Sequence, residues 1–232
     1  MDLQTNSVIA AEALVRWRLE DGTYLPPSSF VDIFEKNRFC SKLDFYMLKK
    51  AILQIREWID MGMEPVNISV NQSKIVFYHE NYISELKSLL EEYNVSGSYI
   101  TLEVLESTVI EDIDIFNSIL TEVKKLGFSV SLDDFGSGYS SLNVLSKLQI
   151  DELKIDRIFL HTKSEVDNQR TKWILESIID IAKKSQILVV VEGVESKQDD
   201  LFIKNLGADV GQGYFYGRPL SISAFNDLIE TK

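Results

Sequence analysis

Residues 132–141 read Leu-Asp-Asp-Phe-Gly-Ser-Gly-Tyr-Ser-Ser, and here an apolar run ends in two adjacent carboxylates. The glycines that follow allow a tight loop whose backbone can approach a ligand. Because adjacent acids repel one another unless a cation lies between them, Asp133 and Asp134 are candidate metal ligands. The structural alternative is a strand end followed by a helix, with Asp134 or Ser140 as the helix cap.

On both sides of this stretch, short segments rich in β-branched residues alternate with longer segments whose apolar residues recur at helical spacing. Strands are predicted over 8–14, 65–70, 99–104, 127–133, 151–155, 187–191 and 208–212. Helices are predicted over 42–60, 80–93, 112–125, 169–184 and 197–206. This alternation indicates an α/β fold with a mainly parallel sheet, and a TIM-like (β/α) barrel in particular. Such a barrel normally has about eight strands, so one strand is missing or misread.

Polar side chains close nearly every predicted strand, which is where a barrel of this type carries its chemistry. They are Glu12, Asn67, Glu103, the pair Asp133–Asp134, Lys154, Glu192 and Gln212. Taken singly, several have structural explanations. Glu12 could pair with Arg16, and Asn67 could satisfy strand-end backbone groups. Glu103 could face solvent, and Lys154 could be a surface lysine. Independent explanations for six or seven strand ends multiply to a small probability, so the joint pattern indicates a metal-dependent enzyme.

Composition narrows the class of protein and of metal. The chain has 232 residues, 45% of them apolar, which suits one domain with a sizeable core. With one cysteine, Cys40, and two histidines, a cysteine zinc site is excluded, and oxygen ligands favour Mg²⁺ or Mn²⁺. The net charge of −12 argues against a nucleic-acid polymer as partner. Because no apolar run could span a bilayer and no secretory signal is seen, we expect a cytoplasmic protein.

Seven motifs in a fixed order carry a family resemblance. They are Glu-Ala-Leu-Val-Arg-Trp at 12–17, Asn-Ile-Ser at 67–69, Leu-Glu-Val-Leu-Glu-Ser at 102–107, Asp-Asp-Phe-Gly-Ser-Gly-Tyr-Ser-Ser at 133–141, Leu-Lys-Ile-Asp at 153–156, Glu-Gly-Val-Glu at 192–195 and Gln-Gly-Tyr at 212–214. With them the chain resembles the EAL domain, a family of bacterial cyclic di-GMP phosphodiesterases, from about residue 3 to residue 230. We therefore expect a single EAL domain over residues 1–232.

The resemblance implies roles for individual residues. Two Mg²⁺ or Mn²⁺ ions would be bound, with Asp133 shared between them. The first would be held by Glu12, Asn67, Glu103 and Asp133, and the second by Asp133, Asp134 and Glu192. Lys154, Glu192 and Gln212 would act on the attacking water. Leu14, Arg16 and Gln212 would contact the substrate, and Glu106 and Glu195 would position the Asp-Phe-Gly loop.

Two departures from the family pattern are visible. The family's first strand, which carries a Gln-Pro pair, is absent before Met1, so the chain is expected to be a fragment of a longer protein. An uncovered strand edge favours association, and we expect a homodimer or a strand-exchanged oligomer. Leu105 also stands where the family has a threonine, so no hydroxyl is available there.

The sequence thus predicts a metal-dependent phosphodiesterase that hydrolyses cyclic di-GMP to linear pGpG. The alternative is a cyclic di-GMP receptor that binds without hydrolysis, which Leu105 and the absent strand favour. A more distant alternative is a magnesium-dependent barrel enzyme in which Lys154 abstracts a proton from a carboxylate substrate.

Overall fold

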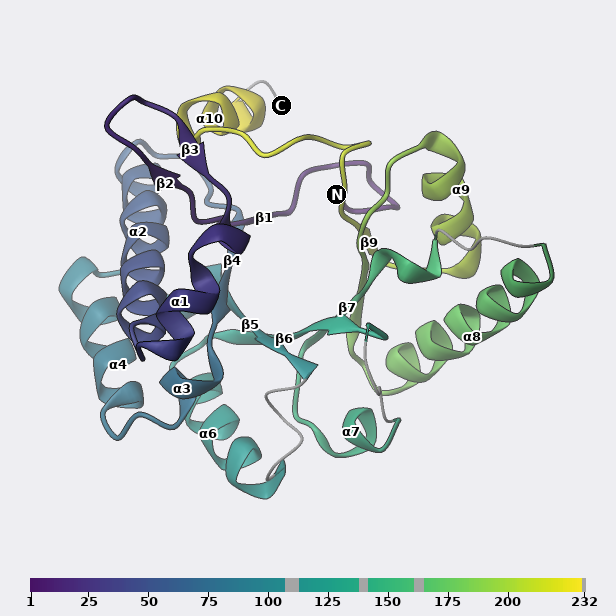
Figure 1. Cartoon of the computed structure of the whole chain (residues 1–232), viewed down its shortest axis with the longest axis horizontal. Helices are drawn as coiled ribbons and strands as arrows, with labels where there is room; N and C mark the ends of the chain where they lie inside the picture. The colour runs from purple at the N-terminus through teal and green to yellow at the C-terminus, as the bar shows by residue number, and fades with distance from the viewer. Residues whose placement is uncertain (107–112, 138–141, 161–164, 231–232) are drawn as a thin grey trace. The chain divides into compact units, whose positions relative to one another are not determined.

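The computed structural model describes residues 1–106, 113–137, 142–160 and 165–230, which belong to two compact units (Figure 1). The C-unit comprises residues 1–9 and 131–232, and the N-unit comprises residues 10–130. Ser107 and residues 138–141 of the sequence motifs lie outside the described ranges.

The N-unit contains three parallel strands, β1 (Ala10–Glu12), β4 (Asn67–Gln72) and β5 (Ile100–Leu105). Their register pairs Glu12 with Ser69 and Asn71 with Glu103. Because parallel strands end at the same edge of a sheet, polar side chains near those ends come together. A short antiparallel hairpin, β2 (Trp17–Arg18) with β3 (Tyr24–Leu25), follows β1.

Helices cover the strands of the N-unit. They are α1 (Val31–Lys36), α2 (Cys40–Asp60), α3 (Lys74–Phe77), α4 (Tyr82–Tyr93) and α6 (Ile113–Lys125), with 3₁₀ turns η1 (Pro27–Ser29) and η2 (Gly97–Tyr99). The apolar face predicted for the helix at 42–60 is the buried face of α2, where Leu48, Ile52 and Ile55 are each 0% exposed. In Figure 1 α2 lies beside α4, and the two helices are in contact. This packing places the buried face of α2 against β4.

The C-unit contains β6 (Ser129–Phe135), β7 (Glu152–Ile155), β8 (Leu188–Val191) and β9 (Val210–Gly211), paired in parallel from β6 through β9. Its helices are α7 (Leu142–Lys147), α8 (Glu165–Lys184), α9 (Lys197–Leu206) and α10 (Ile222–Glu230), with the turn η3 (Arg157–Phe159). At the outer side of β9, Asp2 pairs antiparallel with Val210, and Gly211 exchanges hydrogen bonds with Met1. Part of the β9 edge is therefore paired by the start of the chain.

Local sequence signals set the bounds of α9. Ser196 caps its first turn by accepting from the backbone N–H of Asp199, and the Asp199 carboxylate accepts from the N–H of Ser196, a capping box. The helix ends at Gly207, whose φ of +84° suits a residue without a Cβ. The predicted helix over 197–206 is confirmed at both ends.

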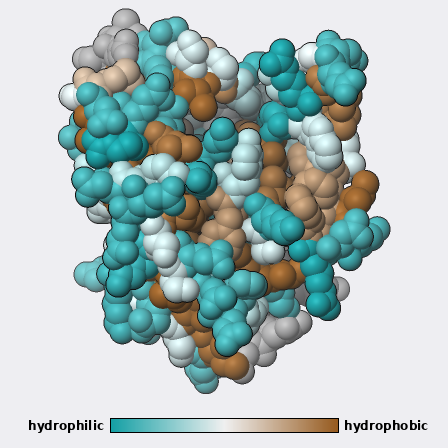
Figure 2. Space-filling view, turned by 90° about the vertical axis from the view of Figure 1, so that its left-hand side faces the viewer, coloured by the Kyte–Doolittle hydropathy of each residue, from teal (hydrophilic) through white to brown (hydrophobic). Residues whose placement is uncertain are grey.

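All seven predicted strands are present, with bounds shifted by one to two residues in most cases. The shift at β4 alters the assignment of one site residue, described below. None of the helices within the described ranges has the length and apolar character needed to cross a membrane. Figure 2 shows hydrophilic residues interspersed with smaller hydrophobic patches on the side that lies at left in Figure 1. Exposed apolar side chains scattered in this way are common on protein surfaces.

Candidate functional site

A β-bulge in β6 presents both acids of the Asp-Asp pair toward one residue of β7. Leu132 pairs with Leu153 and Phe135 with Ile155, so Asp133 and Asp134 together oppose Lys154. Asp134 has a φ of +56°, in the left-handed region that a residue other than glycine seldom adopts. Consecutive residues of a regular strand point to opposite faces, and the bulge removes that separation.

The bulge helps to form an acidic cluster within the C-unit. Asp133, Asp134 and Glu192 each offer a carboxylate oxygen, and these oxygens all lie within 4.8 Å of one another. The ammonium of Lys154 lies 2.8 Å from Oε1 of Glu192 and 3.1 Å from Oδ1 of Asp133. The Lys154 side chain is only 2% exposed, so its charge depends on these carboxylates for stabilisation.

The donor set of this cluster fits a hard divalent cation. Three carboxylates from two strand ends supply oxygen ligands of the kind that Mg²⁺ and Mn²⁺ prefer. Three acids so close together repel one another, and a cation relieves that repulsion. Lys154 supplies a single positive charge to the group, which leaves the cluster negative and able to attract a metal ion.

Gln212 is held beside the Glu192 loop through its backbone. Its N–H donates to the carbonyl of Val191 at 2.9 Å, and its carbonyl accepts from the N–H of Val194 at 3.0 Å. These two bonds span the residue Glu192. Gly213 follows with a φ of +154°, and a Cβ there would lie 2.2 Å from the carbonyl oxygen of Val194. Glycine is therefore required for the close approach of the two loops.

The η3 turn packs against both glycines that follow the acidic strand ends. A Cβ on Gly136 would lie 2.2 Å from the ring of Phe159, and a Cβ on Gly193 would lie 2.2 Å from Cβ of Arg157. Both glycines have positive φ, +99° and +68° respectively. The turn therefore forms a common support for the loops after β6 and β8.

A second group of candidate ligands lies in the N-unit. The side-chain Nδ2 of Asn71 donates to Oε1 of Glu12 at 3.0 Å. Glu103 is paired with Asn71 in the register of β4 and β5 and is 1% exposed. With Nδ2 engaged by Glu12, the oxygen of the Asn71 amide is the atom that remains to bind a cation.

Asn67, expected among the metal ligands, lies at the other end of β4. It is the first residue of the strand and pairs with Ala10, the first residue of β1. Its side chain donates to the carbonyl of Ser98 and accepts from the hydroxyl of Thr101. The prediction that Asn67 closes its strand is wrong, because β4 continues to Gln72. Sequence reasoning missed Asn71, which lies four residues further along the same strand, next to its end.

The residues predicted to contact the substrate or to position the Asp-Phe-Gly loop differ in how far they are exposed. Leu14 is 42% exposed just after β1, and the exposed Arg16 guanidinium donates to the carbonyl of Val15. Glu106 is buried in the N-unit, whereas Leu105 beside it is 42% exposed. Glu195 is exposed in the C-unit, and its backbone N–H donates to the Asp199 carboxylate. Their expected roles toward substrate and loop stay predictions.

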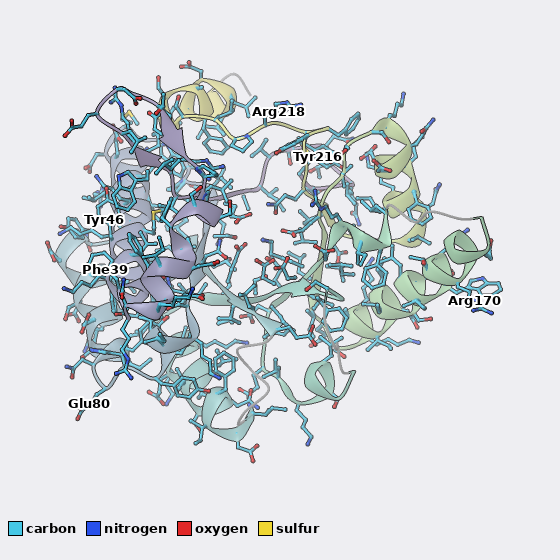
Figure 3. The ribbon with its side chains drawn as sticks, viewed as in Figure 1. Phe39, Tyr46, Glu80, Arg170, Tyr216 and Arg218 are labelled. Carbon is cyan, nitrogen blue, oxygen red and sulfur yellow. The ribbon has the colours of Figure 1, made fainter. Side chains whose placement is uncertain are left out.

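Aromatic residues support the segment after Gln212, and Figure 3 labels two of the residues involved, Tyr216 and Arg218. The Tyr216 hydroxyl donates to Asp200 at 2.7 Å, and its ring fills the space above Gly211. Burial and the Asp200 carboxylate raise the pKa of Tyr216, so its hydroxyl remains a donor at neutral pH. The Arg218 guanidinium lies 4.6 Å from the ring centroid of Tyr214.

Comparisons with known proteins agree with this arrangement. The sequence profile of the EAL domain matches residues 1–219. The Pseudomonas aeruginosa bifunctional diguanylate cyclase/cyclic di-GMP phosphodiesterase MucR is 33% identical over 213 residues, 92% of this chain and 31% of that protein. The Escherichia coli K12 cyclic di-GMP phosphodiesterase PdeR is 31% identical over 94% of this chain and 32% of that protein. The chain thus spans about a third of the length of these curated relatives.

Solved structures give the same fold. The PaMucR phosphodiesterase in its c-di-GMP complex has a TM-score of 0.86 and 33% identity, covering 94% of this chain and 88% of that one. The EAL enzyme Bd1971, bound to cAMP and cyclic di-GMP, has a TM-score of 0.89 and 29% identity, covering 98% and 62%. The predicted α/β fold, a TIM-like (β/α) barrel of the EAL type, is confirmed.

Proposed function

The chain belongs to the EAL domain family, and we propose on that basis that it is a metal-dependent phosphodiesterase that hydrolyses cyclic di-GMP to linear pGpG. The observation that carries the proposal is the cluster of Asp133, Asp134 and Glu192 around the buried Lys154 ammonium. Support for the substrate comes from the cyclic di-GMP named for PdeR and for the PaMucR complex.

The residues of the C-unit would act on the attacking water. Hydrolysis forms a bond from the water oxygen to phosphorus, breaks the bond from phosphorus to the 3′ oxygen, and moves one proton from water to that leaving oxygen. Glu192 is suited to accept the water proton, and the Lys154 ammonium to hold the water and offset negative charge on the phosphate. Gln212, whose backbone is fixed beside the Glu192 loop, would complete the contacts to water or substrate.

The two ligand groups would serve two cations. Asp133, Asp134 and Glu192 would hold one, and Glu12, Asn71 and Glu103 of the N-unit would hold the other, with Asn71 in the place first given to Asn67. Bound Mg²⁺ or Mn²⁺ would supply charge neutralisation at the phosphate and a lowered pKa for a coordinated water. Leu14 and Arg16 are proposed to contact the substrate, and Glu106 and Glu195 to position the loop after Asp134. Association into a homodimer or a strand-exchanged oligomer is also proposed.

The experiment is hydrolysis of cyclic di-GMP by the purified chain with Mg²⁺, with Mn²⁺ and with EDTA, following pGpG by chromatography. We expect metal-dependent pGpG that Asp133→Asn reduces by at least about a hundredfold, since removing one charge from a metal site costs several kcal/mol at the transition state. The matched control is Asp180→Asn in α8, an exposed acid paired with Lys184, which should retain activity. Normal turnover by Asp133→Asn would contradict the site assignment.

A receptor that binds cyclic di-GMP without hydrolysis is the second candidate, and Leu105 favours it. Its exposed side chain offers no hydroxyl where the family has a threonine. Cyclic di-GMP binding that persists in EDTA, with no pGpG formed in Mg²⁺ or Mn²⁺, would establish the receptor. Absence of any cyclic dinucleotide binding would contradict both candidates.

A further inference from the structure

Gln72 is the last residue of β4, directly after Asn71, and its side-chain amide is hydrogen-bonded at both ends. Its Nε2 donates to the main-chain carbonyl of Asn71 at 3.0 Å. Its Oε1 accepts from the hydroxyl of Tyr82 at 3.0 Å. Gln72 is only 5% exposed, so water is poorly placed to substitute for either bond. The backbone of Asn71 is therefore tied to α4 through one amide.

Tyr82 fixes the orientation of that amide. The residue begins α4 and is 1% exposed, with its ring 5.1 Å from the ring of Phe77 and 6.0 Å from that of Phe45, centroid to centroid. Burial raises the pKa of the Tyr82 hydroxyl well above its ordinary value, so the hydroxyl keeps its proton and acts as a donor. Because the carbonyl of Asn71 can only accept, Gln72 presents its nitrogen there and its oxygen to the Tyr82 hydroxyl.

A second anchor holds the residue after Gln72. The Asp44 carboxylate, on α2 and 8% exposed, accepts from the backbone N–H of Ser73 at 3.0 Å and also from the Ser73 hydroxyl. The main chain on the carboxyl side of Asn71 is thus bound to two different helices. Its side chain, in turn, is bound to Glu12 in β1.

We propose that Tyr82 and Gln72 are positioning residues that, together with the Asp44–Ser73 anchor, set the place of the Asn71 side-chain oxygen for a divalent cation. This inference rests on the proposed function, because it takes Glu12 and Asn71 as cation ligands. The main chain is fixed by Gln72, and the amide nitrogen by Glu12. The direction of the remaining oxygen follows from those two constraints, and ligands must lie within a few tenths of an ångström of their working positions.

Tyr82→Phe tests the proposal with little change of shape. The ring stays, the donor is lost, and Gln72 is left with a buried oxygen that has lost this partner, so its amide is free to turn away from Asn71. We expect the dissociation constant for Mn²⁺, measured by calorimetry on metal-free protein, to rise about tenfold, as when a residue that orients a ligand is removed. The KM for cyclic di-GMP at saturating Mn²⁺ should be unchanged.

Three further variants separate positioning from stability. Ile55→Val, in the buried face of α2, is the control for a general loss of stability, and it should lower Tm without weakening Mn²⁺ binding. The double variant Tyr82→Phe/Gln72→Leu removes the Gln72 amide oxygen together with the hydroxyl that donates to it, so part of the lost Tm should be recovered. Mn²⁺ binding should stay weak, because the carbonyl of Asn71 has lost the Gln72 donor. The milder Asp44→Asn should weaken Mn²⁺ binding less than Tyr82→Phe.

The outcomes are distinct. Unchanged Mn²⁺ affinity in Tyr82→Phe, or affinity restored in the double variant, would overturn the positioning role and leave the proposed function standing. If the unmodified chain binds no Mn²⁺ and forms no pGpG, the proposed function fails, and this inference with it. The side-chain amide resonances of Asn71 in metal-free protein give an independent check, and they should shift in Tyr82→Phe but not in Ile55→Val.

Discussion

The side-chain amide of Asn71 donates to Glu12, whereas Asn67, four residues earlier on the same strand, bonds to Ser98 and Thr101 instead. Residues four apart on a strand share a face, so both asparagines point to the same side of the sheet. At about 3.3 Å per residue they are roughly 13 Å apart along it. Position along β4, and not residue type, decides which asparagine can join the acids at the strand ends.

Asn71→Ala and Asn67→Ala form a matched pair that tests this assignment. We expect Asn71→Ala to weaken Mn²⁺ binding by at least about tenfold, because it removes a ligand oxygen and the donor to Glu12. Asn67→Ala should lower Tm slightly through the lost bond to Thr101 and keep metal affinity. Calorimetric titration of both variants provides the measurement. The reverse ranking would return the ligand role to Asn67.

Replacing Lys154 with methionine should separate binding of metal from turnover. The change leaves Asp133 and Glu192 without the buried ammonium, so metal-free protein should be less stable. Added Mn²⁺ should raise the Tm of this variant more than it raises that of the unmodified chain, since the cation relieves a larger repulsion. Turnover of cyclic di-GMP should fall by about 10² to 10⁴. Equal Mn²⁺-induced Tm shifts in the two proteins would count against this role of Lys154.

Stability should depend on pH through Asp44. Burial raises the pKa of Asp44 to about 6, despite hydrogen bonds from Ser73, and the nearby Glu35 carboxylate adds to the rise. Because the folded state binds the proton more tightly than the unfolded state, this group favours folding more as pH falls from about 6 toward 4, and the effect is lost as pH rises through 6.

Asp44→Asn removes this titration. The difference in unfolding free energy, unmodified chain minus variant, should rise by about 1 kcal/mol between pH 7.5 and pH 5. Urea denaturation of both proteins at the two pH values measures it, and other titrating groups cancel in the difference. A constant difference across this range would show that Asp44 has an ordinary pKa in the folded state.

Replacing Gly193 and Gly22 with alanine should separate the cost of a steric clash from the cost of backbone strain. Both have positive φ, +68° and +84°, but a Cβ on Gly193 would lie 2.2 Å from Cβ of Arg157, whereas one on Gly22 meets nothing within 4 Å. Gly22→Ala should cost about 1 kcal/mol of unfolding free energy from conformation alone. Gly193→Ala should cost about 1 to 3 kcal/mol more and reduce turnover, because the Glu192 loop must move off the η3 turn. Chemical denaturation and the pGpG assay check both.

Much of this arrangement is predictable from sequence because its signals are local. The β-branched runs, the helical periodicity of α2 and the capping residues of α9 each depend on neighbours a few positions away. The acids at 133, 134 and 192 could likewise be assigned to strand ends. The cluster they form depends on register between β6, β7 and β8, which composition and periodicity do not specify.

Two features of the site could not be predicted: which asparagine lies at the end of β4, and which distant residues form hydrogen bonds with this segment. Asn67 and Asn71 satisfy the same two-residue period, so alternation alone cannot tell which one ends the strand. The hydrogen bonds of Gln72 to Tyr82 and of Ser73 to Asp44 join β4 to helices on both sides of it in sequence. In the sequence, the polar residues of such a buried network cannot be distinguished from ordinary loop or helix residues, because their partners are brought near only when the helices pack against the strand.

Because of the bulge at Asp133 and Asp134, the number of acids in the cluster depends on the number of residues in β6. Deletion of Asp133 or Asp134 would restore the regular alternation of β6, with one acid left opposite Lys154 and the pairs on either side of it unchanged. The composition of the chain would hardly change, yet the cluster would lose one of its three carboxylates. A change of one residue in the length of this strand would therefore remove as much negative charge from the cluster as the replacement of one of its acids.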